Sequence, residues 1–121
     1  MRKLPSWSPT KASSFWQPGY SWTWPFSACS EALVPGDDWP LLYASLQSLK
    51  AHVQEYPGCQ RFDVFFRAEA EAAVRVHCYT TWDTLEQLEV FLDRGYTFER
   101  LLDDVSEQIR LERSLVMEKV F

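Results

Sequence analysis

The chain has few of the residues on which disulfide bonds and metal sites depend. Among its 121 residues are three cysteines, Cys29, Cys59 and Cys78, and two histidines. No two cysteines form a C-x-x-C pair, and three cannot all pair within one chain. The sequence therefore favours neither a disulfide framework nor a structural zinc site. We expect no bound metal and a reducing, cytoplasmic location.

Long apolar runs and clustered basic residues are also missing. No stretch approaches the roughly 20 apolar residues of a membrane-spanning helix, and no apolar signal segment follows the basic N-terminus. The net charge is −5, with the acidic excess in residues 37–121, which would repel nucleic-acid phosphates. The G-x-S-x-G, P-loop and G-x-G-x-x-G motifs are absent as well. We predict neither a membrane nor a nucleic-acid partner, and find no support for a hydrolase, a nucleotidase or a dinucleotide-binding enzyme.

Aromatic residues are present in excess, at 16% of the chain, including six tryptophans. Many of them fall in residues 1–25, where four prolines disfavour helices and central strands. Burying half of these side chains would contribute several kcal/mol to the stability of the folded protein, at about 25 cal/mol per Å² of apolar surface. The pattern predicts two parts: an N-terminal arm, residues 1–25, packed on the body or on a partner subunit, and a domain formed by residues 26–121.

The first half of this domain shows one helix between two strands. Residues 26–34 predict a strand that Pro35-Gly36 ends. Asp37 or Asp38 then caps a helix whose apolar residues recur at helical spacing until Pro57-Gly58 stops it. In the next strand Phe62, Val64 and Phe66 alternate on one side.

The second half predicts a strand, two helices and a last strand. A loop over residues 68–72 leads into a strand that ends at Trp82, and Asp83 with Glu86 fits a capping box for a helix ending at Gly95. Thr97 caps the following helix, and residues 114–121 form the final strand. This order predicts an α+β fold, a ferredoxin-like split βαβ sandwich with a four-stranded antiparallel sheet and helices on one face.

The other sheet face would carry Phe65, His77, Tyr79 and Arg75, a mixture of apolar and polar groups that is costly to leave bare. Two copies meeting face to face would cover it. We therefore expect a symmetric homodimer.

Two segments together resemble a known family. They are Tyr56 to Phe62, reading YPGCQRF, and Val76 to Asp83, reading VHCYTTWD. Their order and spacing resemble the antibiotic biosynthesis monooxygenase (ABM) family, over roughly Ala32 to Phe121. The resemblance implies a dimeric α+β barrel and an oxidoreductase: a cofactor-independent monooxygenase that acts on a small planar aromatic or polyketide-like molecule.

The same resemblance implies a substrate pocket beside Trp82-Asp83, where the family's oxygenases have a tryptophan at the end of this strand. Cys78 stands where quinone-forming members place an asparagine. The expected substrate-binding residues are Trp82, Phe62, Phe66, Cys78, Phe91 and Phe98. Two alternatives stay open: Trp82 as a plug of the core, and a non-catalytic member that binds a small ligand or forms oligomers.

The two histidines are expected elsewhere. His77 falls on the sheet face opposite Trp82, where it would be an interface residue. His52 lies on the first helix and is expected at the solvated surface.

Overall fold

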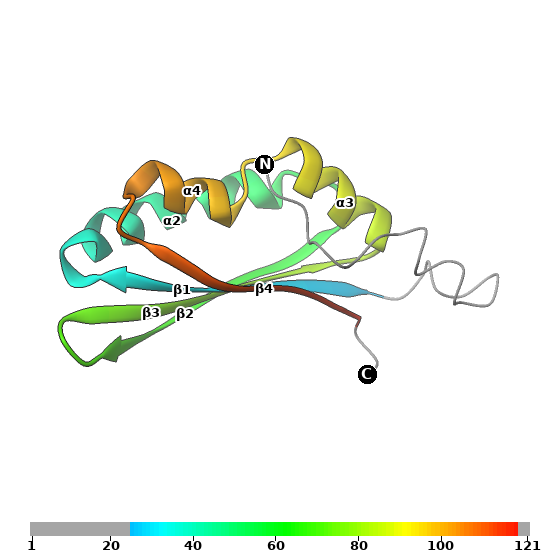
Figure 1. The fold of residues 1–121 in the computed structure, drawn as a ribbon. Coiled ribbons are helices and arrows are strands. Elements are labelled where there is room, and N and C mark those ends of the chain that lie inside the picture. The colour runs from blue at the N-terminus through cyan, green and yellow to red at the C-terminus, as the bar shows by residue number, and fades with distance from the viewer. Residues whose placement is uncertain (1–24, 119–121) are drawn as a thin grey trace.

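The computed structural model describes residues 25–118, and its elements follow the predicted order (Figure 1). The predicted arm, apart from Pro25, and the last three residues lie outside the described residues, so the arm's packing stays a prediction. The elements are β1 (Phe26–Pro35), the 3-10 helix η2 (Gly36–Asp38), α2 (Trp39–Gln54), β2 (Cys59–Glu69), β3 (Ala73–Trp82), α3 (Leu85–Arg94), α4 (Phe98–Val105) and β4 (Arg110–Glu118).

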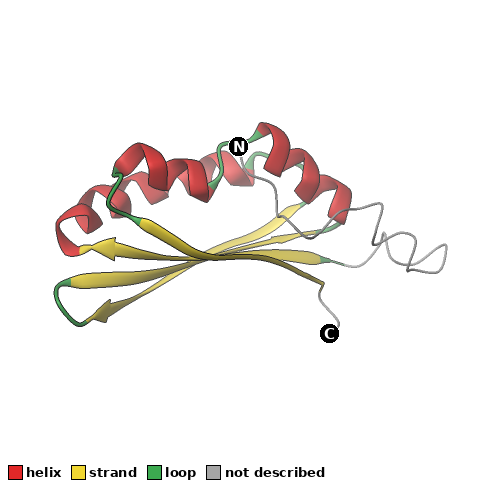
Figure 2. Cartoon of the chain, viewed as in Figure 1, coloured by secondary structure: helices red, strands yellow, loops and turns green. Residues whose placement is uncertain are grey.

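The four strands form one antiparallel sheet in the order β2-β3-β1-β4. All three α-helices lie against one face of this sheet, and the opposite face is not covered by any described helix (Figure 2). The predicted ferredoxin-like α+β fold is confirmed.

The core lies between the sheet and the helices, because alternate strand residues and one row of each helix point into that layer. Its fully enclosed side chains include those of Val34 on β1, Leu42 on α2, Val76 and Trp82 on β3, and Leu88 on α3. Burial of an aliphatic side chain of this kind contributes about 1.5–3 kcal/mol.

The turn before β2 requires a glycine. Gly58 has φ of +90°, a conformation that side chains with a Cβ rarely adopt. A Cβ at this position would also collide with the amide of Gln87 on α3. The predicted Pro57-Gly58 stop is therefore a sharp turn that also lets β2 pass close to α3.

Three predicted boundaries were wrong. The loop predicted over residues 68–72 is shorter than expected, because β2 continues to Glu69. Thr84, rather than Asp83, caps α3, because the Thr84 hydroxyl accepts a hydrogen bond from the Gln87 backbone N–H over 3.2 Å. The Asp83 carboxylate instead accepts a hydrogen bond from the Gln60 side chain. The last strand begins at Arg110, four residues before the predicted Ser114.

His52 was expected at the solvated surface, but it is half-buried among aromatic rings. Its Nε2 atom accepts a hydrogen bond from the Tyr96 backbone N–H over 2.9 Å. His52 therefore joins α2 to the connection between α3 and α4. The other predicted features of these helices, the end of α3 before Gly95 and the Thr97 cap of α4, are confirmed.

Candidate functional site

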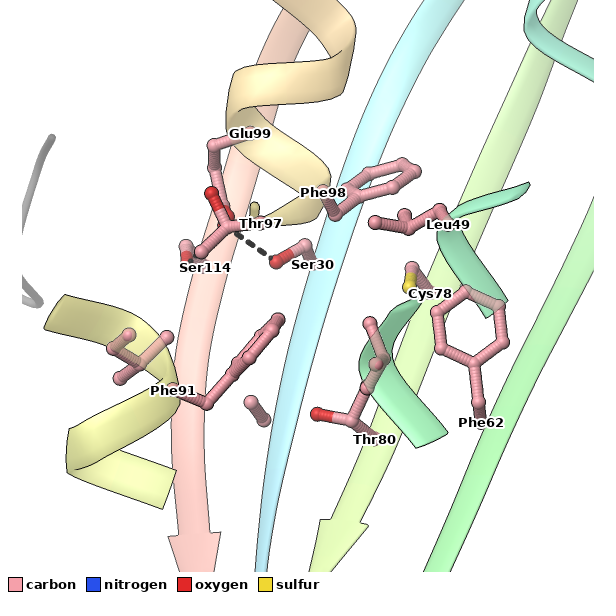
Figure 3. Close-up of a pocket in the computed structure, with 13 residues that line it drawn as sticks. Ser30, Leu49, Phe62, Cys78, Thr80, Phe91, Thr97, Phe98, Glu99 and Ser114 are labelled. Carbon is pink, nitrogen blue, oxygen red and sulfur yellow. Dashed lines mark hydrogen bonds between the residues drawn. The ribbon is translucent and has the colours of Figure 1, made fainter. Parts of the chain in front are cut away.

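A small cavity of about 30 Å³ lies between the sheet and the helices. A volume of this size accommodates one water molecule. Its lining side chains come from all four strands of the sheet and, on the helix side, from α2, α3, α4 and the connection between α3 and α4 (Figure 3). The lining residues are Ala28, Ser30, Leu49, Val53, Phe62, Cys78, Thr80, Phe91, Leu92, Thr97, Phe98, Glu99 and Ser114.

One carboxylate, that of Glu99, is among the mostly apolar side chains that line the cavity. Glu99 lies in the first turn of α4, and its Oε2 atom accepts hydrogen bonds from two serine hydroxyls. The distances are 2.7 Å from Ser30 Oγ and 3.1 Å from Ser114 Oγ. The two serines are direct partners in the β1–β4 register, so the sheet presents both hydroxyls at one place. Figure 3 shows Glu99 reaching from α4 toward them.

Glu99 is electrostatically distinctive. Of the described residues that line the cavity, it alone is charged, and no basic side chain within residues 25–118 forms an ion pair with it. Both serine hydrogen bonds end on Oε2, so Oε1 keeps its full capacity to accept a further hydrogen bond. A partly buried carboxylate without a cation is costly unless donors compensate it, and here two hydroxyls do so.

Four of the six predicted site residues meet at this cavity. Phe62, Cys78, Phe91 and Phe98 line it, and each is buried. Phe66 does not line it. Its side chain is 58% exposed and packs beside Trp39, with the ring centroids 4.8 Å apart.

Trp82 is fully enclosed, with 0% of its surface exposed. Its indole Nε1 donates a hydrogen bond to Thr80 Oγ1 over 2.9 Å, and its ring stacks on Phe91 at 5.1 Å between centroids. Thr80 and Phe91 are both lining residues, whereas Trp82 is not. Trp82 therefore stands behind the cavity wall and supports it.

Cys78 is buried, and burial together with the nearby Glu99 carboxylate raises the pKa of its thiol well above the ordinary range. The thiol therefore stays protonated at neutral pH and is unsuited to act as a nucleophile. All three cysteines are free: Cys29 and Cys78 are buried, and Cys59 is half-buried.

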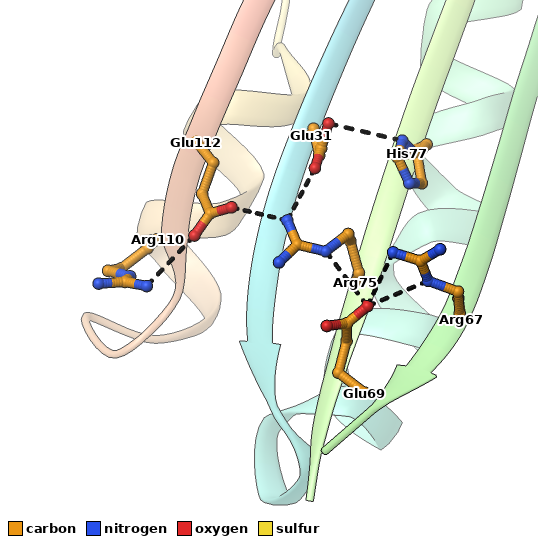
Figure 4. Close-up of polar contacts among 7 residues, drawn as sticks. All are labelled: Glu31, Arg67, Glu69, Arg75, His77, Arg110 and Glu112. Atoms are coloured by element: carbon orange, nitrogen blue, oxygen red, sulfur yellow. Dashed lines mark hydrogen bonds and ion pairs between the residues drawn. The ribbon is translucent and has the colours of Figure 1, made fainter. Parts of the chain in front are cut away.

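The uncovered sheet face carries a connected set of ion pairs (Figure 4). The Arg75 guanidinium on β3 contacts three carboxylates, one from each of the other three strands. They are Glu31 on β1 at 2.7 Å, Glu112 on β4 at 2.6 Å and Glu69 on β2 at 3.3 Å. The hydrogen bonds with Glu112 and Glu31 raise the pKa of Arg75 further, so it remains charged. His77, as expected, lies on this face, with Nδ1 3.9 Å from the Glu31 carboxylate.

Sequence reasoning missed Glu99, Ser30 and Ser114. Of these three residues, only Ser30 could have been recognised from the sequence as a buried polar group, because it occupies an inward position in a strand whose other inward residues are apolar. The partner of such a buried hydroxyl cannot be read from the sequence, since Glu99 lies 69 positions away.

Neither a metal site nor a membrane helix is found among residues 25–118. No group of three or more His, Cys, Asp or Glu side chains is placed to hold a metal ion. No helix there is both long and apolar enough to cross a membrane.

No family model matches the chain, and no curated protein matches it. Several solved structures share its fold. A candidate antibiotic biosynthesis monooxygenase from Nitrosomonas europaea is 16% identical, with a TM-score of 0.58, and the match covers 85% of this chain and 97% of the other. A Bacteroides thetaiotaomicron protein of unknown function, described as a possible oxidoreductase, is 15% identical with a TM-score of 0.62, covering 80% and 99%.

A third neighbour is a dimeric ferredoxin-like protein from an uncultured marine organism. It is 13% identical with a TM-score of 0.63, and the match covers 80% of this chain and 96% of the other. At such low identities these likenesses establish the fold alone.

Proposed function

We propose that the protein is a cofactor-independent oxygenase of the ABM type, with its substrate site in the cavity between the sheet and the helices. The observation that carries this proposal is the lining itself: the rings of Phe62, Phe91 and Phe98 surround a space that holds a single charged group. Such a lining suits a planar aromatic ligand of small size, including polyketide-like molecules.

In this proposal the substrate supplies the electrons. A CH₂ group of a hydroxylated, electron-rich ring system reacts with O₂ and becomes a carbonyl group. One oxygen atom enters the product, and the other leaves as water with the two hydrogens of the CH₂ group. The protein contributes a dry environment and polar groups that favour the anionic form of the substrate.

The cavity must widen to admit a ring, because about 30 Å³ holds only one water molecule. Phe91 and Leu92 belong to α3 and Phe98 to α4, and only the short segment 95–97 connects these helices. In our proposal these side chains turn aside when the substrate enters and close over it again.

We further propose that the working unit is a homodimer, joined through the uncovered sheet face. Three large apolar side chains of β2 and β4 are exposed there: Phe65 at 59%, Leu115 at 43% and Met117 at 43%. Apolar surface of this kind is costly in water, and a second copy would cover it. The dimeric ferredoxin-like neighbour supports this arrangement.

A second candidate function is binding without catalysis. The enclosed Trp82 favours it, because an indole with no exposed surface cannot stack on a substrate without a rearrangement. In that case the same cavity would hold a ligand, or the domain would serve only to form oligomers.

Oxygen consumption distinguishes the two functions. The protein is mixed with 1,8-dihydroxyanthrone, a planar tricyclic phenol with a reactive CH₂ group, and O₂ uptake and the quinone product are measured against the spontaneous reaction. We expect acceleration by the protein, and loss of it in Ala28→Leu, which adds volume to the cavity wall. The control Val90→Leu, at an exposed position on α3, should keep the activity. No acceleration over the spontaneous rate would rule out the oxygenase.

A further inference from the structure

We propose that Glu99 recognises a ring hydroxyl of the ligand and accepts its proton, so that the ligand class is a neutral planar phenol or enol. This inference rests on the proposed function for the location of the site. It adds the group that selects the ligand and the chemical feature that it selects.

The first support is the way the carboxylate is held. Ser30 and Ser114 donate to the same oxygen, Oε2, from adjacent strands of the sheet. These two hydrogen bonds fix the orientation of the carboxylate, and they leave Oε1 able to accept a proton or a hydrogen bond from a ligand.

The second support is charge. A hydroxyl donating to a carboxylate makes a charge-assisted hydrogen bond, roughly twice as strong as one between neutral groups. No described cation pairs with Glu99, so no described ion pair offsets the negative charge of the carboxylate toward a ligand in the cavity. The site should therefore favour hydroxyl donors and reject ligands that are already anionic, such as aromatic carboxylates.

The third support is chemical. When the ring O–H transfers its proton to Oε1, the electron pair of the broken O–H bond stays on the ligand oxygen and enriches the ring. Ser30 and Ser114 continue to donate to Oε2 throughout. The ring is then in the electron-rich form that the proposed reaction with O₂ requires, and the proton is held by Glu99.

A purely structural role, in which Glu99 ties α4 to the sheet, makes a different prediction. Removing a tie would lower stability and weaken every ligand equally. Removing a hydroxyl-recognising group would weaken hydroxylated ligands selectively. The ratio of two affinities separates these roles, because a change in stability cancels from it.

The experiment measures binding of 2-naphthol and of its methyl ether, 2-methoxynaphthalene, at neutral pH by the change in ligand fluorescence. The two ligands share one ring system and differ in the hydroxyl proton. For the wild type we expect 2-naphthol to bind at least about tenfold more tightly than the ether. In Glu99→Gln the preference should fall to about threefold or less, because only a neutral acceptor remains.

Two further variants complete the design. Ser114→Ala removes one of the two donors and should reduce the preference less than Glu99→Gln does. Asp103→Asn removes a carboxylate from an exposed position on the same helix, and it should leave the preference unchanged.

An unchanged preference in Glu99→Gln, an equal loss of affinity for both ligands, or no binding of either ligand to the wild type would overturn the inference. Its failure differs from that of the proposed function. A hydroxyl preference that depends on Glu99, without acceleration of O₂ uptake, would reject only the oxygenase. Acceleration of O₂ uptake that survives in Glu99→Gln would reject only the role of Glu99.

Discussion

The indole Nε1 of Trp82 donates a hydrogen bond to the hydroxyl of Thr80, two residues earlier on the same face of β3, over 2.9 Å. Both side chains are buried, at 0% and 7% exposure. A buried indole N–H needs an acceptor, and the strand supplies one from its own inward row. This hydrogen bond therefore allows the large indole ring to be fully buried in the core without leaving its N–H donor unpaired.

Thr80→Val should destabilise the protein by about 1–3 kcal/mol, because the change keeps the shape of the side chain but leaves the Trp82 N–H unpaired. Trp82→Phe removes the donor and also reduces the buried ring. In the double variant the loss should be smaller than the sum of the two single losses, since neither partner then remains unpaired. Urea unfolding measures all three free energies. Simple additivity would show that the hydrogen bond contributes nothing.

Replacing Tyr79 with glutamate should dissociate the proposed dimer, because the change places an unpaired charge on the uncovered sheet face. Tyr79 lies beside His77 and Phe65 on that face, with ring centroids 6.5 Å and 5.9 Å away. Tyr43→Glu is the matched control, since Tyr43 is 53% exposed on α2, on the opposite side of the sheet. Sedimentation equilibrium reports the mass of each variant. A monomeric wild type at micromolar concentration would contradict the dimer.

The turn between β2 and β3 offers a stabilising change. Ala72 has φ of +59°, in the left-handed region that favours glycine. Ala72→Gly should raise the free energy of unfolding by up to about 1 kcal/mol, because the strain relieved exceeds the added flexibility of the unfolded chain. Ala70→Gly, in the same turn but without a positive φ, should lower it. Thermal melts of the two variants should shift in opposite directions, and a shared direction would speak against strain at Ala72.

Stability should depend on Tyr96 at alkaline pH. Burial and the hydrogen bond to the Asp104 carboxylate raise the pKa of Tyr96 to about 12. An unfolded tyrosine loses its proton near pH 10, while the folded state keeps it. The contribution of Tyr96 is therefore complete below about pH 10 and is lost as the pH rises toward 12.

The test compares urea unfolding of the wild type and Tyr96→Phe between about pH 9 and 12. The wild type should lose stability more steeply over this range than the variant. Asp104→Asn should reduce the steepness in part, because it removes the charge and weakens the hydrogen bond. Equal slopes for all three proteins would show that Tyr96 releases its proton equally in both states.

Periodicity predicted the order of the elements because each has a clear apolar row. It also placed Phe66 on the correct side of β2, the side of Phe62. Alternation reports a face, however, and not whether a helix covers that face. Since β2 is an edge strand, the helices do not fully cover Phe66, and its side chain is 58% exposed beside Trp39.

The expected residues that line the candidate site are three phenylalanines and the buried thiol of Cys78. Phe62, Phe91 and Phe98 could be assigned to the core layer from local spacing. The polar part could not, because it depends on the β1–β4 register and on the placement of α4, which bring Ser30, Ser114 and Glu99 together. These are long-range consequences of packing, and no short window of sequence contains them.

The irregularity in β4 has a consequence for how this gene could tolerate change. Between Glu31 and Ala32 the register shifts, so that Leu111 pairs with Ala32 and Ser114 pairs with Ser30. Glu112 is the extra residue. Because of this extra residue, Leu111 and Ser114 both face the helices although they are three positions apart. The bulge also interrupts the alternation of inward and outward residues, so the sequence pattern did not show that the strand begins at Arg110. Loss of the Glu112 codon would leave Leu111 opposite Ala32, Arg113 opposite Glu31 and Ser114 opposite Ser30 in a regular strand, so every later residue would keep its face. The strand is therefore more tolerant of losing a residue at the bulge than elsewhere, where such a loss would reverse the face of every residue after it.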